Sequence, residues 1–165
     1  IVVMKAGLVM QIGTPDEVFN RPQNIFVASF IGSPQMNLFD GILIKEGDVY
    51  SLSILGKRVS LSGSKSKILE EKGIGERKVT IGVRPEEIII SDEGCFSGRV
   101  GVAEHMGSTI HLHLESEDKE IVAVTESREQ NGLQKSFPID ALVHFSFSPE
   151  SMHIFDAESG NNIGL

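Results

Sequence analysis

The chain has 165 residues, of which 40% are hydrophobic, and a formal net charge of −8 from 23 acidic and 15 basic side chains. The hydrophobic content is enough for a packed core and excludes a disordered chain, while the seventeen glycines favour a turn-rich, mainly β fold. The acidic balance, with one Tyr and no Trp for base stacking, argues against a nucleic-acid partner, and the single cysteine excludes an internal disulfide.

The first 32 residues predict a β-hairpin followed by two short helices. Two apolar runs, 1–4 and 8–13, are separated by a Lys-Ala-Gly turn. Thr14 is suited to cap the first helix, and Glu17 completes a capping box three residues later. The second helix carries apolar residues at helical spacing and ends at Gly32. Because the chain opens in an apolar run without an initiator methionine, we expect it to be a piece of a longer protein.

The sequence changes character after a loop at 33–37, where short strand-like runs replace the helical pattern. These runs recur at intervals of roughly 8–12 residues, which is typical of a β-barrel or sandwich and not of an α/β sheet. They cover 41–44, 49–54, 57–61, 78–83, 88–90, 96–104, 109–114, 121–124, 141–147 and 152–155. A polar stretch at 64–72 has room for one or two helical turns. We therefore place a domain boundary after residue 32, which gives domains at 1–32 and 33–165.

Four segments, in this order along the chain, resemble the ATP-binding subunits of carbohydrate-type ATP-binding-cassette (ABC) importers, the maltose-transporter ATPase family. They are IVVMKAG at 1–7 with QIGTP at 11–15, FVASFIGSP at 26–34, GVRPE at 82–86, and EHMGS at 104–108 with FDAESG at 155–160. Any one of these runs is a weak signal, but their shared order and spacing over nearly the whole chain are specific. The fold that the resemblance implies for residues 33–165 is a barrel like the oligonucleotide-binding (OB) fold, called the transport-associated domain. Residues 1–32 then resemble the end of the ATPase domain.

The resemblance implies a regulatory and dimerisation role for this region in a cytoplasmic subunit at the inner face of the cell membrane. The expected partners are a second copy of the chain, membrane permease subunits that contact the ATPase domain, and an inhibitory regulatory protein. The transported solute is expected to be a sugar or a related molecule. No apolar run approaches the ~20 residues that a membrane-spanning helix needs.

The sequence lacks the motifs that phosphoryl transfer requires. No G-x-x-x-x-G-K-[ST] phosphate loop is present, because the glycines at 73 and 75 are followed by Glu76 and Arg77. An apolar strand ending in paired Asp-Glu, the signature helix and the switch histidine are also missing. We therefore assign no catalytic, cofactor-binding or metal-binding residue to this chain. ATP and Mg²⁺ are expected only in the full-length parent, which is implied to be an ATPase.

The candidate contact residues for a subunit or regulator lie in two loops where we expect Gly82 and Gly107 to allow close backbone approach. The candidates are Arg84, Pro85, Glu86, Glu87, Met106, Gly107 and Ser108. Pro85 is expected to end a strand by removing a backbone donor, and Arg84 to fix the turn through a carboxylate or carbonyl.

Two alternatives assign a ligand to the barrel. His111 and His113 share one face of a predicted strand and form a possible metal pair, but no third ligand is identifiable. We favour the interpretation that the two histidines belong to a polar outer face of the strand, whose other face is apolar and buried. Gly107 and Ser108 also suit a small anion nest, so the rival function is a molybdate-like oxyanion module of a transport protein. The net charge on residues 41–165 disfavours an unaided oxyanion site.

The missing phosphate loop and magnesium carboxylate give a direct prediction. Isothermal titration of this chain with MgATP should show no binding in the micromolar range, because neither the phosphate cradle nor the metal carboxylate is present. Micromolar affinity for MgATP would contradict the prediction.

Overall fold

The computed structural model describes residues 1–61, 63–129 and 132–165. Their contacts divide into two compact units, the first made of Ile1–Val83 with Pro149–Leu165 and the second of Arg84–Ser148. Residues 1–32 therefore group with the strands that follow them. The domain limits expected from the sequence, 1–32 and 33–165, stay a prediction.

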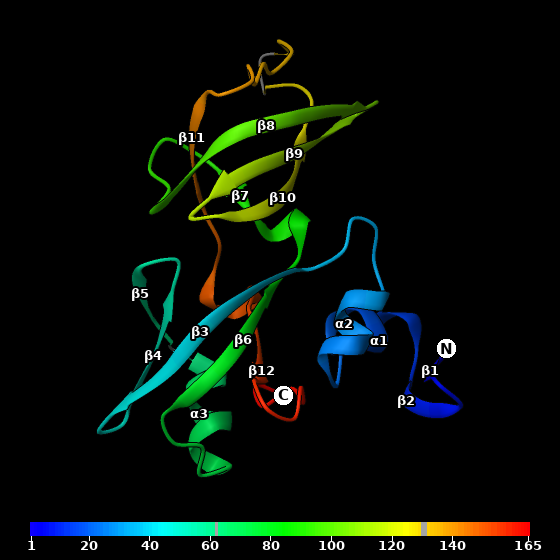
Figure 1. The fold of residues 1–165 in the computed structure, drawn as a ribbon, viewed down its shortest axis with the longest axis vertical. Helices are drawn as coiled ribbons and strands as arrows, with labels where there is room; N and C mark the ends of the chain where they lie inside the picture. Colours follow the sequence, from blue (N-terminus) through cyan, green and yellow to red (C-terminus); the bar gives the residue numbers. More distant parts are fainter. Residues whose placement is uncertain (62, 130–131) are drawn as a thin grey trace. The chain divides into compact units, whose positions relative to one another are not determined.

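The first unit opens with the expected hairpin and two helices (Figure 1). Strands β1 (Val2–Lys5) and β2 (Leu8–Ile12) pair through a turn in which Ala6 and Gly7 both have positive φ. Helix α1 (Pro15–Asn20) has the predicted capping box, since the Glu17 amide donates to Thr14 Oγ1 at 3.2 Å and the Thr14 amide donates to Glu17 Oε2 at 2.8 Å. Helix α2 (Ile25–Phe30) is capped at its C-terminus by Ile31, one residue before the expected Gly32, and the Ile31 amide donates to the Val27 carbonyl.

A five-stranded antiparallel sheet follows in the first unit, with strand order β12-β6-β3-β4-β5. The strands are β3 (Asn37–Glu46), β4 (Val49–Ile54), β5 (Lys57–Ser60), β6 (Arg77–Val83) and β12 (His153–Asp156). The polar stretch forms helix α3 (Gly63–Glu71), and the 3-10 helix η2 (Pro149–Ser151) precedes β12. The core of this sheet is strongly apolar: Leu43, Leu52 and Ile81 are completely buried. The equally buried Tyr50 donates from its hydroxyl to the Ile74 carbonyl at 2.7 Å, which satisfies its polar end.

The second unit is a second five-stranded antiparallel sheet with order β10-β9-β8-β11-β7. It contains the 3-10 helix η1 (Pro85–Glu87) and strands β7 (Ile89–Ile90), β8 (Phe96–Met106), β9 (Thr109–Ser116), β10 (Lys119–Glu126) and β11 (Leu142–Ser146). In β9 the expected alternation is confirmed: Ile110, Leu112 and Leu114 are fully buried, whereas His111 and His113 lie on the outer face. The mainly β fold class predicted from the sequence is therefore confirmed.

Three details of the second unit differ from the sequence expectation. The run at 88–90 gives only a two-residue strand, because Pro85 begins a 3-10 turn that takes up the preceding residues. Strand β8 extends two residues past 104 and contains a register shift at Gly101. In the run 141–147, which contains β11, the expected apolar face is only half formed, since Phe145 and Phe147 are buried but Ala141 and Val143 are half-buried.

Three phenylalanine rings form the centre of the second unit. The Phe96 ring stacks on Phe145 with a centroid distance of 5.6 Å and on Phe147 with a distance of 4.9 Å. Gly94 lies against the backbone of Phe145, where a Cβ atom would have no room. The cluster thus depends on both ring size and close backbone approach.

The buried ring of Phe145 gives a stability prediction. Replacing Phe145 by Ala should lower the free energy of unfolding by about 3–5 kcal/mol, because a fully buried aromatic side chain leaves a cavity. Leu142→Ala on the same strand is the control, since Leu142 is 56% exposed and should change the free energy by no more than about 0.5 kcal/mol. Urea unfolding of both variants measures the difference; equal losses would contradict the assignment of the core.

Candidate functional site

The seven candidate contact residues all fall in the second unit but in two separate places of it (Figure 1). Arg84 to Glu87 form the start and body of η1, in which Arg84 and Pro85 are buried while Glu86 and Glu87 are exposed. Met106 to Ser108 form the exposed turn that joins β8 to β9. The structure therefore does not bring the two groups into one site.

Arg84 anchors η1 through its backbone as well as carrying a charge. Its carbonyl accepts from the Glu87 amide at 3.0 Å, and only 4% of the residue is exposed. Burial lowers the pKa of the Arg84 guanidinium, while the charge of Glu86 acts in the opposite direction. Glu86 and Glu87 therefore present the outward charge of this turn, and Arg84 lies behind them.

The Met106–Ser108 turn is open to solvent. Gly107 has a φ of +76°, and a Cβ atom placed on it would meet nothing within 4 Å. The Ser108 carbonyl accepts from the Ser127 amide at 2.9 Å, which fixes the turn to the chain that leaves β10. Gly82, expected to serve the same surface, instead gives room to Met36 and Phe155 inside the first unit. That part of the expectation was wrong, because the space beside Gly82 is filled by the core of its own unit.

The outer face of β8, β9 and β10 holds an ionic cluster that the sequence did not reveal. The two ring nitrogens of His113 face different carboxylates: Nδ1 lies 2.7 Å from Glu120 Oε1, and Nε2 lies 3.4 Å from Glu104 Oε2. Glu120 chiefly, and Glu104 in addition, raise the pKa of His113, while partial burial acts in the opposite direction. Within the described ranges no group of three or more His, Cys, Asp or Glu side chains is arranged to hold a metal ion.

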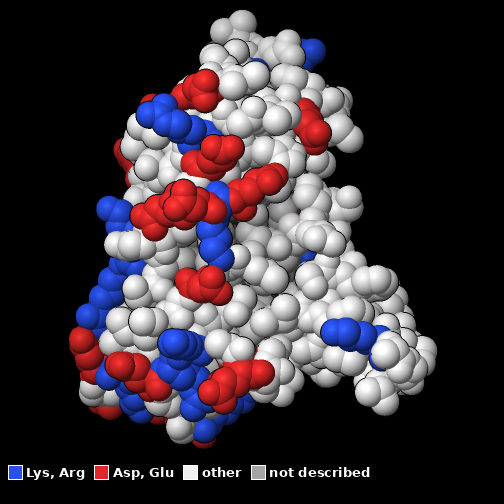
Figure 2. All heavy atoms as spheres, viewed as in Figure 1, with Lys and Arg blue, Asp and Glu red and all other residues white. Residues whose placement is uncertain are grey.

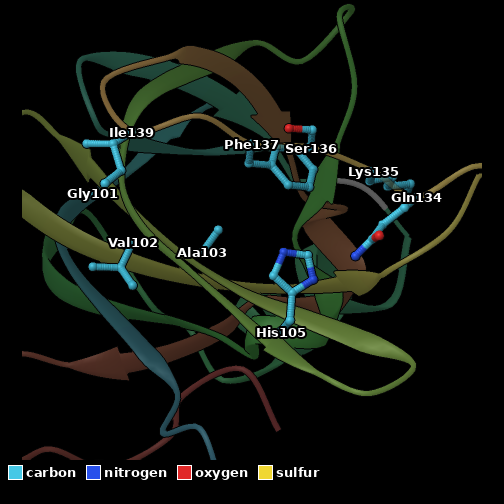
Figure 3. Close-up of a pocket in the computed structure, with 9 residues that line it drawn as sticks. All are labelled: Gly101, Val102, Ala103, His105, Gln134, Lys135, Ser136, Phe137 and Ile139. Carbon is cyan, nitrogen blue, oxygen red and sulfur yellow. The ribbon is translucent and has the colours of Figure 1, made fainter.

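A second unpredicted feature is an open pocket of about 450 Å³ beside β8 (Figure 3). The register shift at Gly101 sets Ala103 and His105 opposite the buried Leu112 and Ile110, so both side chains project from the inner face of the sheet. The other wall is an irregular segment without a sequence pattern that would have revealed it. The lining residues are Gly101, Val102, Ala103, His105, Gln134, Lys135, Ser136, Phe137 and Ile139.

The polar groups of this pocket are partly engaged within the unit. Lys135 Nζ donates to Thr125 Oγ1 at 3.1 Å, and the Lys135 amide donates to the Ser127 carbonyl at 2.9 Å. The Lys135 ammonium is thereby directed to β10. On the face of the molecule shown in Figure 2, acidic and basic side chains interleave and do not separate into regions of one sign.

Two family descriptions match the chain. The MalK OB-fold domain matches residues 32–88, and the TOBE domain matches residues 81–155. The chain therefore contains a MalK-type OB-fold region and a TOBE region.

Its relatives of known type are ATP-binding proteins of import systems. The multiple sugar-binding transport ATP-binding protein MsmK of Streptococcus mutans is 35% identical over 93% of this chain and 40% of its own length. The trehalose/maltose import ATP-binding protein MalK of Thermococcus litoralis is 32% identical over 99% of this chain and 44% of its own length. The sn-glycerol-3-phosphate import ATP-binding protein UgpC of a Ruegeria species is 34% identical over 99% of this chain and 42% of its own length. The chain is thus homologous to ABC importer ATP-binding subunits, and it spans about two fifths of their length.

The fold is also found among solved structures. The cytoplasmic molybdate-binding protein ModG has a TM-score of 0.52 at 14% identity and covers 72% of this chain and 94% of its own. At that identity the likeness concerns the fold alone. None of the helices in the described part of the chain is long and apolar enough to cross a membrane.

The ionic cluster around His113 predicts a pH dependence. The pKa of His113 in the folded state is raised above its ordinary value of about 6.5. The ion pairs of protonated His113 therefore stabilise the fold fully below about pH 6.5, and this stabilisation is lost as the pH rises through the raised pKa. Glu120→Gln should therefore lower the free energy of unfolding at about pH 6, by on the order of 1 kcal/mol or less, and change it little at about pH 9.

Glu117→Gln in the β9–β10 turn is the matched control and should show no such pH-dependent difference. Urea unfolding at both pH values measures the effect. A loss for Glu120→Gln that is the same at both pH values would contradict the role of the His113 charge.

Proposed function

We propose that this chain is the regulatory and dimerisation region of the ATP-binding subunit of an ABC importer for sugars or related solutes. The observation that carries the proposal is the coverage: relatives with sugar, trehalose/maltose and sn-glycerol-3-phosphate import functions match this chain almost from end to end. The MalK-type OB fold and the TOBE domain lie in the same span.

The catalytic work then belongs to a part of the parent that this chain does not supply. ATP and Mg²⁺ would be bound by an ATPase domain at the cytoplasmic face of the membrane, where hydrolysis is coupled to a permease. The residues of this chain do not fit ATP and Mg²⁺, because the sequence has no phosphate loop and the described residues form no metal-ligand cluster. Its own contribution is therefore to contacts between subunits and regulators.

The first 32 residues support a place beside a larger domain. The hairpin buries Val3 against Val18 and Val27, yet most of its other apolar side chains are more than half exposed. These exposed residues, together with one on α2, are Ile1, Val2, Met4, Leu8, Val9, Ile12 and Phe30. An apolar set of this kind is typical of a surface that packs on another domain or chain. We assign it to contact with the ATPase domain of the parent.

A lasting contact between two regulatory regions has a simple physical use. It keeps two ATPase halves at a high effective concentration, so that they close on ATP without a new bimolecular encounter. The η1 turn and the Met106–Ser108 turn are the proposed contact surfaces, because each exposes side chains at a turn of the backbone. The same surfaces are available to an inhibitory regulatory protein.

An oxyanion-binding module is the weaker second candidate. The pocket beside β8 has Lys135, Ser136 and His105 in its wall, which are groups that suit an anion. The Lys135 ammonium is already bonded to Thr125, however, and the chain as a whole is acidic. Titration calorimetry with molybdate separates the two candidates, since a regulatory contact region has no need of such a site.

Association of the chain tests the proposal. Sedimentation velocity over a concentration series should show a nucleotide-independent dimer, and Met106→Glu should weaken its association constant by about tenfold, as expected for one well-placed interface residue. Met106 is 58% exposed, so the charge should not disturb the fold.

Val49→Glu is the control, because Val49 is 55% exposed but lies in the β3–β4 hairpin of the other unit. A chain that stays monomeric at all concentrations would overturn the dimerisation role. An equal decrease of the association constant in both variants would show that the Met106 turn is not part of the interface.

A further inference from the structure

The short segment after β12 connects two parts of the first unit that are far apart in sequence. Residues 157–163, here called the return segment, fold back along β12. The Ile163 amide donates to the Ile154 carbonyl at 2.8 Å, and Phe155 and Asn162 form an isolated antiparallel β-bridge. The reversal is fixed by Asp156, whose Oδ1 accepts from the Ser159 amide at 2.8 Å and the Ser159 hydroxyl at 3.0 Å. The return segment therefore acts as a further short strand at the β12 edge.

The opposite edge of the return segment is bonded to the linker between α1 and α2. The Ile25 amide donates to the Gly160 carbonyl at 2.9 Å, and the Asn162 amide donates to the Gln23 carbonyl at 2.8 Å. Asn162 adds a side-chain bond, from Nδ2 to the Pro22 carbonyl, at 2.9 Å. Three hydrogen bonds thus join this linker and the first residue of α2 to the return segment.

The same linker is fixed on its far side by the hairpin. Gln11 of β2 is 95% buried and uses both ends of its amide: Nε2 donates to the Arg21 carbonyl at 3.1 Å, and Oε1 accepts from the Gln23 amide at 2.9 Å. Asn24 Nδ2 donates to the Met10 carbonyl at 3.4 Å. A continuous series of hydrogen bonds therefore runs from β12 through the return segment and the linker to β2.

Apolar packing supports the same connection. Ala28 of α2, Met36 and Phe155 of β12 form one buried cluster, against which Ile25 and Leu38 pack. Helix α2 is thus attached to the sheet by side chains as well as by the return segment.

We propose that the return segment is a clasp that holds the hairpin–helix segment, residues 1–31, to the sheet of the first unit, so that the two move as one body. The connecting loop at 32–36 is then not a free hinge. The inference goes beyond the proposed function and does not depend on it. In a parent with an ATPase domain it would mean that a displacement of the hairpin is transmitted directly to β12 and the sheet.

Hydrogen exchange on the whole chain tests the clasp. Asn162→Pro removes both the amide donor and the side-chain donor to the linker. Asn162→Ala keeps the amide donor and removes the two side-chain bonds, one to the Pro22 carbonyl and one that Oδ1 accepts from the Gly164 amide at 3.0 Å. The amides of Val27, Ala28 and Ile31 should lose protection by about fivefold for each hydrogen bond removed. The amides of the β3–β4 hairpin should change by less than about twofold, because they lie outside the clasp.

Asn161→Ala is the matched control, since Asn161 takes part in the return segment through its backbone amide and carbonyl. It should leave α2 protection unchanged. If Asn162→Pro unfolds the whole chain, the exchange data of Asn162→Ala decide. A loss of exchange protection confined to residues 14–31 supports the clasp. A uniform loss of protection, or no loss, overturns it.

The coupling must also act in the reverse direction, because linkage between two sites is reciprocal. Gln11→Ala loosens the linker from the hairpin side and should lower the exchange protection of the Asn162 and Ile163 amides. Unchanged protection of these two amides would show that the return segment and the hairpin are independent, and would overturn the proposal.

Discussion

The pairing of β6 with β12 is the interaction on which the first unit depends. It joins Gly82 to His153 and Ile81 to Ile154, so residues on either side of the second unit become neighbours in one sheet. Because Gly82 has no side chain, Met36 and Phe155 pack over it, and Phe155 then reaches Ala28 of α2. A single antiparallel pair thus sets the sheet edge, one end of the core and the position of the helices.

Much of this architecture is readable from local patterns. The capping box at Thr14 and Glu17 and the alternation of β9 follow from residue types at short spacing, and the structure confirms both. The resemblance to importer ATP-binding proteins likewise depends on short runs in a fixed order, and the matches to the MalK OB-fold and TOBE domains confirm it.

The features that the sequence did not reveal depend on register between strands. Neither the His113 cluster nor the pocket at His105 follows from one strand alone, because the register shift at Gly101 decides which residues of β8 face inward. The contact of Gly82 with Met36 and Phe155 depends on a strand that arrives from the far end of the chain. The role of the seven candidate contact residues stays a proposal, and the structure places them in two separate turns.

The return of the chain to complete the first unit also has a consequence for folding during synthesis. Strand β6 is made before the second unit and β12 after it. At a synthesis rate of about 5–20 residues per second, the β6 edge waits several seconds for its partner. During that interval its backbone donors and acceptors and the apolar groups beside Ile81 are available to other chains, which is the condition that favours misassembly. Efficient production of this protein should therefore benefit from a chaperone that shields the nascent sheet until β12 has been made.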